Sequence, residues 1–154
     1  MTYRITHYPH LADLAALAGH DIGSSDWLLI DQARINLFAE ATGDHQWIHI
    51  DPERAVAGPF GAPIAHGFLT LSLLPLLFAG AFAIDDVRMG VNYGLNRVRF
   101  VSPVRERSRL RGCFKLLRYE PLEGGAQLTV EATIELEGSA KPACVAETVS
   151  RRYL

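Results

Sequence analysis

The sequence predicts an α+β fold, in which one long buried helix packs against an antiparallel sheet. The apolar residues follow a mostly helical period up to about residue 84 and a strand period from about residue 87. The longest uncharged run, Gly67–Ile84, is apolar nearly all round, which favours a helix surrounded by protein. The segment Gln127–Glu137 alternates polar and apolar residues strictly, as a half-exposed antiparallel strand does.

The first predicted helix runs from Asp31 to Ala41. Asp31 has the short acidic side chain that is favoured at an N-cap, and Gly43 can end the helix in a left-handed conformation. One face of this helix is apolar and consists of Ile35, Phe38 and Ala39.

A second helix start follows at Asp51-Pro52, where an N-cap residue precedes a proline at the first helical position. This pattern predicts a short helix over residues 53–57, and the glycines and prolines of Gly58–Pro63 then predict a loop. Between the first two helices we expect another loop, which carries Asp44, His45 and His49.

The third and longest helix is predicted over Gly67–Phe82. The uncharged run that contains it is shorter than the roughly 20 apolar residues of a membrane-spanning helix. It also contains Thr70, Ser72 and Pro75, so a buried core helix is the better interpretation. Pro75 predicts a kink or a break, because proline cannot donate the helical hydrogen bond.

The second half of the chain supplies most of the predicted strands. Glu123-Gly124-Gly125 marks a hairpin turn between two of them. The strand candidates, including one early segment, are Trp27–Ile30, Val91–Val101, Ser108–Tyr119, Ala126–Glu137 and Ala143–Tyr153.

Length and composition predict one globular domain that spans residues 1–154. The chain is 49% hydrophobic and 21% charged, which is ordinary globular usage and excludes disorder. The net charge of -2 provides no global field that would recruit nucleic acid or an anionic membrane. Cys113 and Cys144 are too few for a disulfide scaffold, and residues 1–19 lack a signal-peptide pattern, so we expect a cytoplasmic protein.

Asp44 and His49 are the candidate acid–base pair. A carboxylate and an imidazole can together hold one water molecule and move its protons. Their ordinary pKa values of about 3.9 and about 6.5 allow different protonation states near neutral pH. On spacing alone, an N-cap or turn aspartate beside a surface histidine is the better interpretation.

The segment Ala65-His66-Gly67 opens the long apolar helix. Free backbone N–H groups at such a point favour developing negative charge, and a glycine lets a ligand approach the backbone. The simpler interpretation is that Gly67 only permits a tight entry into the helix.

These motifs, in this order along the chain, resemble those of the MaoC-like dehydratases, the (R)-specific enoyl-CoA hydratases of the hot-dog fold. The family signature reads Gly-Asp-x-Asn-Pro-x-His, and residues 43–49 follow it except that Gln46-Trp47 replaces Asn-Pro. The segment 91–100 and the pairs Asp26-Trp27 and Asp31-Gln32 resemble the branch related to the nodulation protein NodN.

The resemblance implies a hot-dog fold and a homodimer whose sheets pair across the interface. It implies hydration of a trans-2-enoyl thioester, or the reverse dehydration, on CoA or acyl carrier protein. Asp44 and His49 would then handle the water without a metal or a cofactor, and which of them is the base stays open. Ala65, His66 and Gly67 would bind the thioester oxygen.

Several residues near these motifs are candidates for the substrate pocket, although core packing or a turn explains them equally well. They are Gln46, Trp47, Phe60, Gly61, Phe68 and Asn92. The hot-dog fold also hosts thioesterases, so an acyl-CoA thioesterase and a non-catalytic protein that binds acyl thioesters are the competing hypotheses.

A metal site is a weaker interpretation of five residues in this region. They are Asp44, His45, His49, Asp51 and His66. The spacing of His45 and His49 suits a metal only on a helix, and Gly43 and Asp51-Pro52 argue for a loop. Arginines at odd positions from 97 to 111 share a predicted strand face. They are either ligands for the CoA phosphates or, as we favour for any single one, a solvated face that discourages edge pairing.

Overall fold

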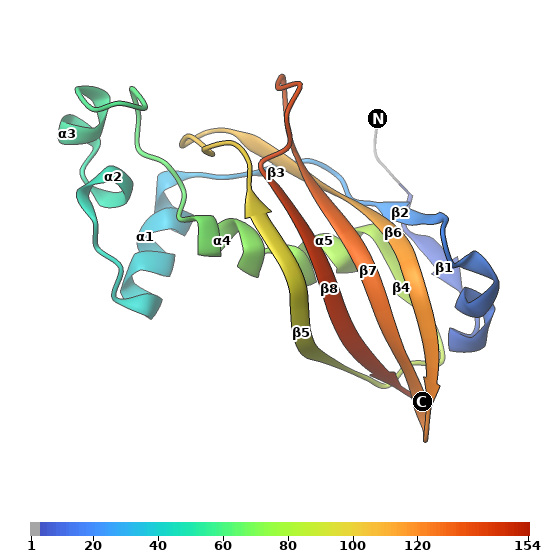
Figure 1. Ribbon diagram of the computed structural model, residues 1–154. Helices are drawn as coiled ribbons and strands as arrows, with labels where there is room; N and C mark the ends of the chain where they lie inside the picture. The colour runs from blue at the N-terminus through green and yellow to red at the C-terminus, as the bar shows by residue number, and fades with distance from the viewer. Residues whose placement is uncertain (1–3) are drawn as a thin grey trace.

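The structure is a computed structural model that describes residues 4–154. Its main element is a six-stranded antiparallel sheet with the order β2-β6-β7-β8-β5, on which β3 also pairs with β6. Two helices lie across one face of this sheet (Figure 1), which confirms the α+β class. The strands are β2 (Asp21–Ser24), β3 (Leu28–Leu29), β5 (Met89–Phe100), β6 (Arg109–Leu122), β7 (Gly125–Leu136) and β8 (Cys144–Tyr153).

The long apolar helix is broken, as Pro75 predicts. It consists of α4 (Gly67–Ser72) and α5 (Leu74–Ala81), which meet at Leu73. Pro75 stands in the first turn of α5, the position where a missing N–H costs least. No helix among residues 4–154 is both long and apolar enough to cross a membrane.

The predicted end of this helix at Phe82 is wrong by one residue, because Phe82 begins a short strand. This strand, β4 (Phe82–Ile84), pairs in parallel with β1 (Thr6–Tyr8). Four short elements were not predicted from the sequence: β1, β2, β4 and the 3₁₀ helix η1 (Leu11–Leu17). All four are short, and a hydrophobic periodicity can be detected only over a longer segment.

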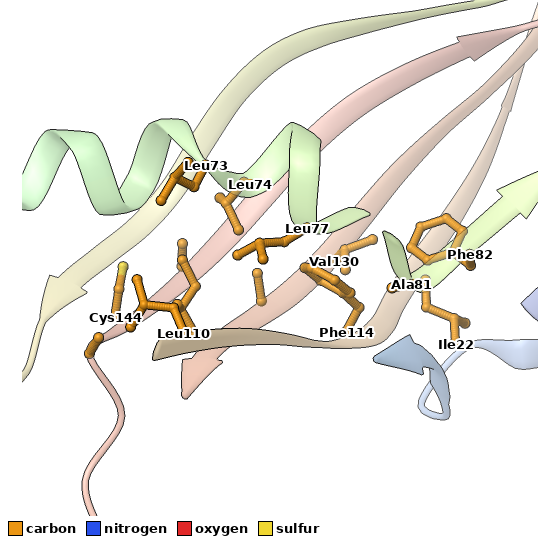
Figure 2. Close-up of a cluster of buried hydrophobic side chains, with 14 of the residues drawn as sticks. Ile22, Leu73, Leu74, Leu77, Ala81, Phe82, Leu110, Phe114, Val130 and Cys144 are labelled. Atoms are coloured by element: carbon orange, nitrogen blue, oxygen red, sulfur yellow. The ribbon is translucent and has the colours of Figure 1, made fainter. Parts of the chain in front are cut away.

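The core fills the space between the helices and the sheet (Figure 2). Leu73, Leu77 and Ala81 point from the helical layer toward Leu110 and Phe114 on β6. Phe78 stacks on Phe114 with ring centroids 4.2 Å apart. Only one side of the helical layer is covered, since Phe68 is 68% and Leu76 is 49% exposed. The helix is therefore not wrapped on all sides within one chain.

Three further helices form a separate group beyond one end of the sheet (Figure 1). They are α1 (Gln32–Thr42), α2 (Trp47–Ile50) and α3 (Pro52–Val56). Asp31 caps α1 by accepting a hydrogen bond from the Arg34 N–H at 2.9 Å, and Asp51 caps α3 in the same way. Gly43 ends α1 in the left-handed conformation, as predicted, with φ of 79°.

The segment between α1 and α3 differs from the prediction. The sequence indicates a loop there, but residues 47–50 form one helical turn that carries His49. The Asp51 N–H closes this turn on the Trp47 carbonyl at 3.1 Å. His49 therefore has a fixed backbone conformation.

The predicted long strands β5 to β8 are confirmed to within three residues at each end. The hairpin between β6 and β7 turns at Gly124, whose φ of 74° is the left-handed conformation that glycine adopts without strain. On β6, Arg111 forms an ion pair with Glu135 of β7, and Arg109 forms one with Glu137, the residue after β7. These two arginines belong to a charged sheet face and are not free for a ligand.

Replacing Phe114 with alanine should lower the free energy of unfolding by about 3–5 kcal/mol, because the ring is fully buried against the helical layer. Urea denaturation measures this loss, and the slope with urea should stay unchanged. Leu37→Ala on α1 is the matched control, since Leu37 is 71% exposed and should change stability by less than about 0.5 kcal/mol. Equal effects at the two positions would contradict the packing.

Candidate active site

Three acid–base side chains converge where the group of small helices meets the start of α4. They are Asp44 after α1, His49 on α2 and His66 at the N-cap of α4. One nitrogen or oxygen atom of each lies within 4.8 Å of the others. The structure thus brings together the predicted pair and one histidine that the sequence analysis placed at the helix entry.

The turn after α1 sets the position of Asp44. Once Gly43 has reversed the chain, the Asp44 carboxylate accepts a hydrogen bond from the Gln46 N–H at 3.3 Å. The Thr42 hydroxyl lies 3.5 Å from the Asp44 N–H. The side chain is exposed on one side, so a ligand can reach it.

Helix α2 is tied to the chain segment before α4 by two hydrogen bonds at Ile64. The Ile64 N–H donates to the Ile48 carbonyl at 3.0 Å, and the Ile64 carbonyl accepts from His49 Nδ1 at 2.7 Å. On the other side, the amide of Gln32 donates to the His49 carbonyl at 2.7 Å. These bonds fix both the backbone and the ring of His49.

The protonation state of His49 follows from these contacts. A carbonyl oxygen only accepts hydrogen bonds, so Nδ1 carries the proton and Nε2 keeps a free lone pair. Burial lowers the pKa of His49 below its ordinary value of 6.5, and the neighbouring His66 lowers it further. The Ile64 carbonyl and Asp44 act in the opposite direction without reversing the shift. His49 is therefore a neutral base near neutral pH.

His66 is held in the opposite tautomer. Its Nε2 donates to the backbone carbonyl of Asp44 at 2.9 Å, which leaves the lone pair on Nδ1. The ring is 2% exposed and stacks on His49, with centroids 3.8 Å apart and planes 25° apart. Phe38 covers it from α1 at 4.9 Å. Nδ1 is buried and has no hydrogen-bond partner within residues 4–154.

The other two residues of the possible metal set lie elsewhere. His45 turns to Glu40 at 2.9 Å, and Asp51 caps α3. The remaining three groups are close enough for an ion, but zinc would lie about 2.0–2.1 Å from each nitrogen, in the plane of each ring. Stacked rings with nearly parallel planes cannot both meet that condition. The arrangement favours a hydrogen-bonded water.

Gly67 is the first residue of α4, next to the histidines. A Cβ atom there would lie 3.0 Å from the ring of Phe100 on β5, which explains the glycine by close packing. The N–H of Ala65 donates to the Val104 carbonyl at 2.7 Å. It is therefore engaged and cannot bind a thioester oxygen, contrary to the role suggested for Ala65, whereas Gly67 stays a candidate.

The predicted pocket residues do not gather at one place. Trp47 packs on Arg54, with the guanidinium 4.3 Å from the ring centroid. Phe68 is exposed and meets Phe100 edge-on. Gln46 precedes α2 and is exposed, and Phe60 and Gly61 lie in the turn after α3. Asn92 lies on β5, where it lines a groove of about 380 Å³ between that strand and the helical layer.

Two groups that the site uses were not predicted from the sequence. Gln32 holds the His49 backbone from the first turn of α1, and the Ile64 carbonyl selects the His49 tautomer. Every residue has a backbone carbonyl, so the identity of Ile64 gives no indication of this role. Gln32 belongs to the Asp31-Gln32 pair of the family resemblance, which predicts no role for its side chain.

Comparison with known proteins gives a consistent result. A sequence model of the MaoC like domain matches residues 13–137. The 3-hydroxyacyl-thioester dehydratase Z of Mycobacterium tuberculosis H37Rv is 57% identical over 94% of this chain and 96% of its own length. Nodulation protein N of Rhizobium leguminosarum bv. viciae is 49% identical over 94% of this chain and 91% of its own.

One solved structure supports the architecture. The unliganded R-hydratase PhaJ1 of Pseudomonas aeruginosa superposes with a TM-score of 0.72 over 95% of this chain and 86% of its own, at 20% identity. The shared fold confirms the predicted hot-dog architecture of a central helix against an antiparallel sheet.

The two stacked imidazoles should hold opposite tautomers, because each donates to a different backbone carbonyl through a different nitrogen. In protein labelled with ¹⁵N-histidine, the ring nitrogen shifts should show His49 protonated at Nδ1 and His66 at Nε2. Spectra of His49→Gln and His66→Gln variants provide the assignments. The same tautomer in both rings would contradict this arrangement.

Proposed function

The chain belongs to the family of MaoC-like dehydratases, and from that premise we propose that it adds water reversibly to trans-2-enoyl thioesters with (R) stereospecificity. The 57% identity to a 3-hydroxyacyl-thioester dehydratase over nearly the whole chain supports a hydro-lyase. The observation that carries the proposal is the neutral His49, which keeps a free Nε2 lone pair and has a ring nitrogen within 4.8 Å of an Asp44 carboxylate oxygen.

His49 is the base in this proposal. In hydration, Nε2 removes one proton from the water, the oxygen bonds to the β-carbon, and the thioester oxygen takes up the negative charge. The imidazolium then returns its proton to the α-carbon, so the enzyme ends as it began. The Asp44 carboxylate stabilises the positive charge that forms on His49 in between. The N–H of Gly67 is the proposed donor to the thioester oxygen.

The groove of about 380 Å³ is the proposed site for the acyl chain. It runs along the helical layer on the side of β5 and begins one turn after Gly67. Leu71, Pro75, Phe78 and Leu95 give it apolar walls, which suit a hydrocarbon chain. We leave the carrier as either CoA or acyl carrier protein.

We also propose a homodimer that forms through β5. This 12-residue strand is one edge of the sheet, and among residues 4–154 it pairs only with β8, so its other side is a ready surface for another strand. Its large apolar side chains are exposed in the single chain: Met89, Val91, Tyr93, Leu95 and Phe100. Pairing with a second copy would cover them.

The proposed place of action is the cytoplasm. Cys113 and Cys144 are both unpaired thiols, and Cys144 is buried in the core. Thiols of this kind stay reduced in the cytoplasm.

Asp44→Asn and His49→Gln should each lower kcat for crotonyl-CoA hydration by about 10²–10⁴-fold, because they remove the stabilising charge and the base. Loss of the enoyl absorbance measures the rate, and chiral analysis of the product tests for the (R) alcohol. Activity of the wild type should fall with acid at a pH below 6.5, since protonation removes the Nε2 lone pair of His49.

His45→Gln is the matched control and should keep wild-type turnover, since His45 is exposed and bonded to Glu40. A thiol reagent in the same assay detects free CoA, which hydration does not release. Thiol release would favour the thioesterase hypothesis, and tight binding without turnover would favour a binding protein. Unchanged turnover in both site variants would exclude the proposed chemistry.

Leu95→Glu should convert the proposed dimer to a monomer, because it places a charge in the middle of the β5 edge. Light scattering should give twice the 17.0 kDa of one chain for the wild type and the single mass for the variant. Val56→Glu is the control, since Val56 is 63% exposed on α3, away from β5. A wild-type monomer would refute the dimer.

A further inference from the structure

His66 has a buried lone pair that the chemistry described so far does not use. The ring is only 2% exposed, so its Nδ1 atom is shielded from solvent. This atom also finds no donor among residues 4–154. A buried acceptor without a donor is unfavourable and rare in folded proteins. A bound group with an O–H or N–H is therefore the expected partner.

The ring cannot turn over to satisfy this atom. A half-turn about the Cβ–Cγ bond would put Cε1 in the place of Nε2 and so break the bond to the Asp44 carbonyl. Stacking between His49 and Phe38 prevents the ring from tilting out of its plane. The Nδ1 lone pair thus keeps a set direction in a ring that stacks on His49. One ring nitrogen of each histidine lies within 4.8 Å of the other and of an Asp44 carboxylate oxygen, so the two rings offer two acceptors to one small site.

Two acceptors match the two O–H groups of one water molecule. We propose that His66 is a further catalytic residue, whose Nδ1 accepts a hydrogen bond from the reacting water in hydration and from the 3-hydroxyl group in dehydration. This inference rests on the proposed hydro-lyase activity and assigns a separate task to each imidazole.

The division of tasks balances the protons. In hydration, the water gives one proton to His49 Nε2 and keeps the other, which donates to His66 Nδ1 while the oxygen attacks the β-carbon. In dehydration, the single O–H of the 3-hydroxyacyl substrate donates to His66 Nδ1. His49 takes the α-proton and passes it to a lone pair of that oxygen, which leaves as water. His66 itself neither gains nor loses a proton.

This role differs from the thioester-binding role that the position of His66 in the sequence suggests. A neutral imidazole with Nε2 engaged has only a lone pair left, and a lone pair repels an oxyanion. His66 therefore belongs on the water side of the site, and the thioester oxygen needs a donor such as the Gly67 N–H.

Two substitutions of His66 separate the two ring nitrogens. In His66→Asn, the side-chain oxygen can stand at the place of Nδ1 and accept a hydrogen bond, while the bond to Asp44 is lost. In His66→Gln, the side-chain amide can still donate to the Asp44 carbonyl, but no acceptor remains at Nδ1. The pair thus tests catalysis against a purely structural role.

We expect kcat for crotonyl-CoA hydration to fall about 10²-fold or more in His66→Gln and at most about 10-fold in His66→Asn. KM and the melting temperature of the Gln variant should stay close to those of the wild type. His20→Gln controls for the loss of a histidine, since His20 is exposed and lies near the opposite end of the sheet from the site.

The inference is overturned if the Gln variant keeps wild-type kcat, if the Asn variant is the weaker enzyme, or if the two lose activity equally. These outcomes leave the proposed function intact, because the wild type still turns over. A wild-type protein that is inactive on every enoyl and 3-hydroxyacyl thioester would instead refute the proposed function, and the role of His66 with it.

Discussion

The site depends on the two-way connection at Ile64. Its N–H and carbonyl bind α2 from both sides, through Ile48 and His49, and the residue also forms a β-bridge to Arg105. Ala65 continues this connection by donating to Val104. A small helical group outside the sheet is thus tied to the long strands. Without it, a four-residue helix such as α2 would have no stability of its own.

The same connection sets the electrostatics of His49. It draws the ring out of solvent, and burial is the largest cause of its lowered pKa. The Ile64 carbonyl accepts a hydrogen bond from the ring. The neutral tautomer therefore keeps a hydrogen bond at Nδ1 when burial removes the ring from bulk water. Desolvation and tautomer selection therefore come from one backbone contact, and both leave Nε2 basic and free.

The stacked histidines place a limit on the charge that the site can hold. A second positive charge at 3.8 Å would be unfavourable in a buried setting, and His66 accordingly contributes to the lowered pKa of His49. The Asp44 carboxylate, close to both rings, compensates for one positive charge. This limit fits a reaction in which a single proton is removed and returned.

The fold was largely predictable because its elements are long and their patterns periodic. Strict alternation revealed β7, Asp31 and Gly43 revealed the ends of α1, and Pro75 revealed the break between α4 and α5. Part of the site was predictable too, since Asp44 and His49 lie in a motif. The task of His66 was not, because it follows from a tautomer that a contact 22 residues away selects.

The missed helix α2 explains what Gln46-Trp47 does in place of the family's Asn-Pro. Gln46 is the N-cap of α2 and Trp47 its first residue, where asparagine and proline would be the favoured signals. The side chain of Gln46 makes no capping hydrogen bond, and Trp47 is not a proline. The backbone nevertheless forms the helical turn of α2. Trp47 adds contacts instead, through Arg54 and through Gly58, where a Cβ atom would lie 3.0 Å from the indole. Packing thus replaces capping, and His49 keeps its place at the site.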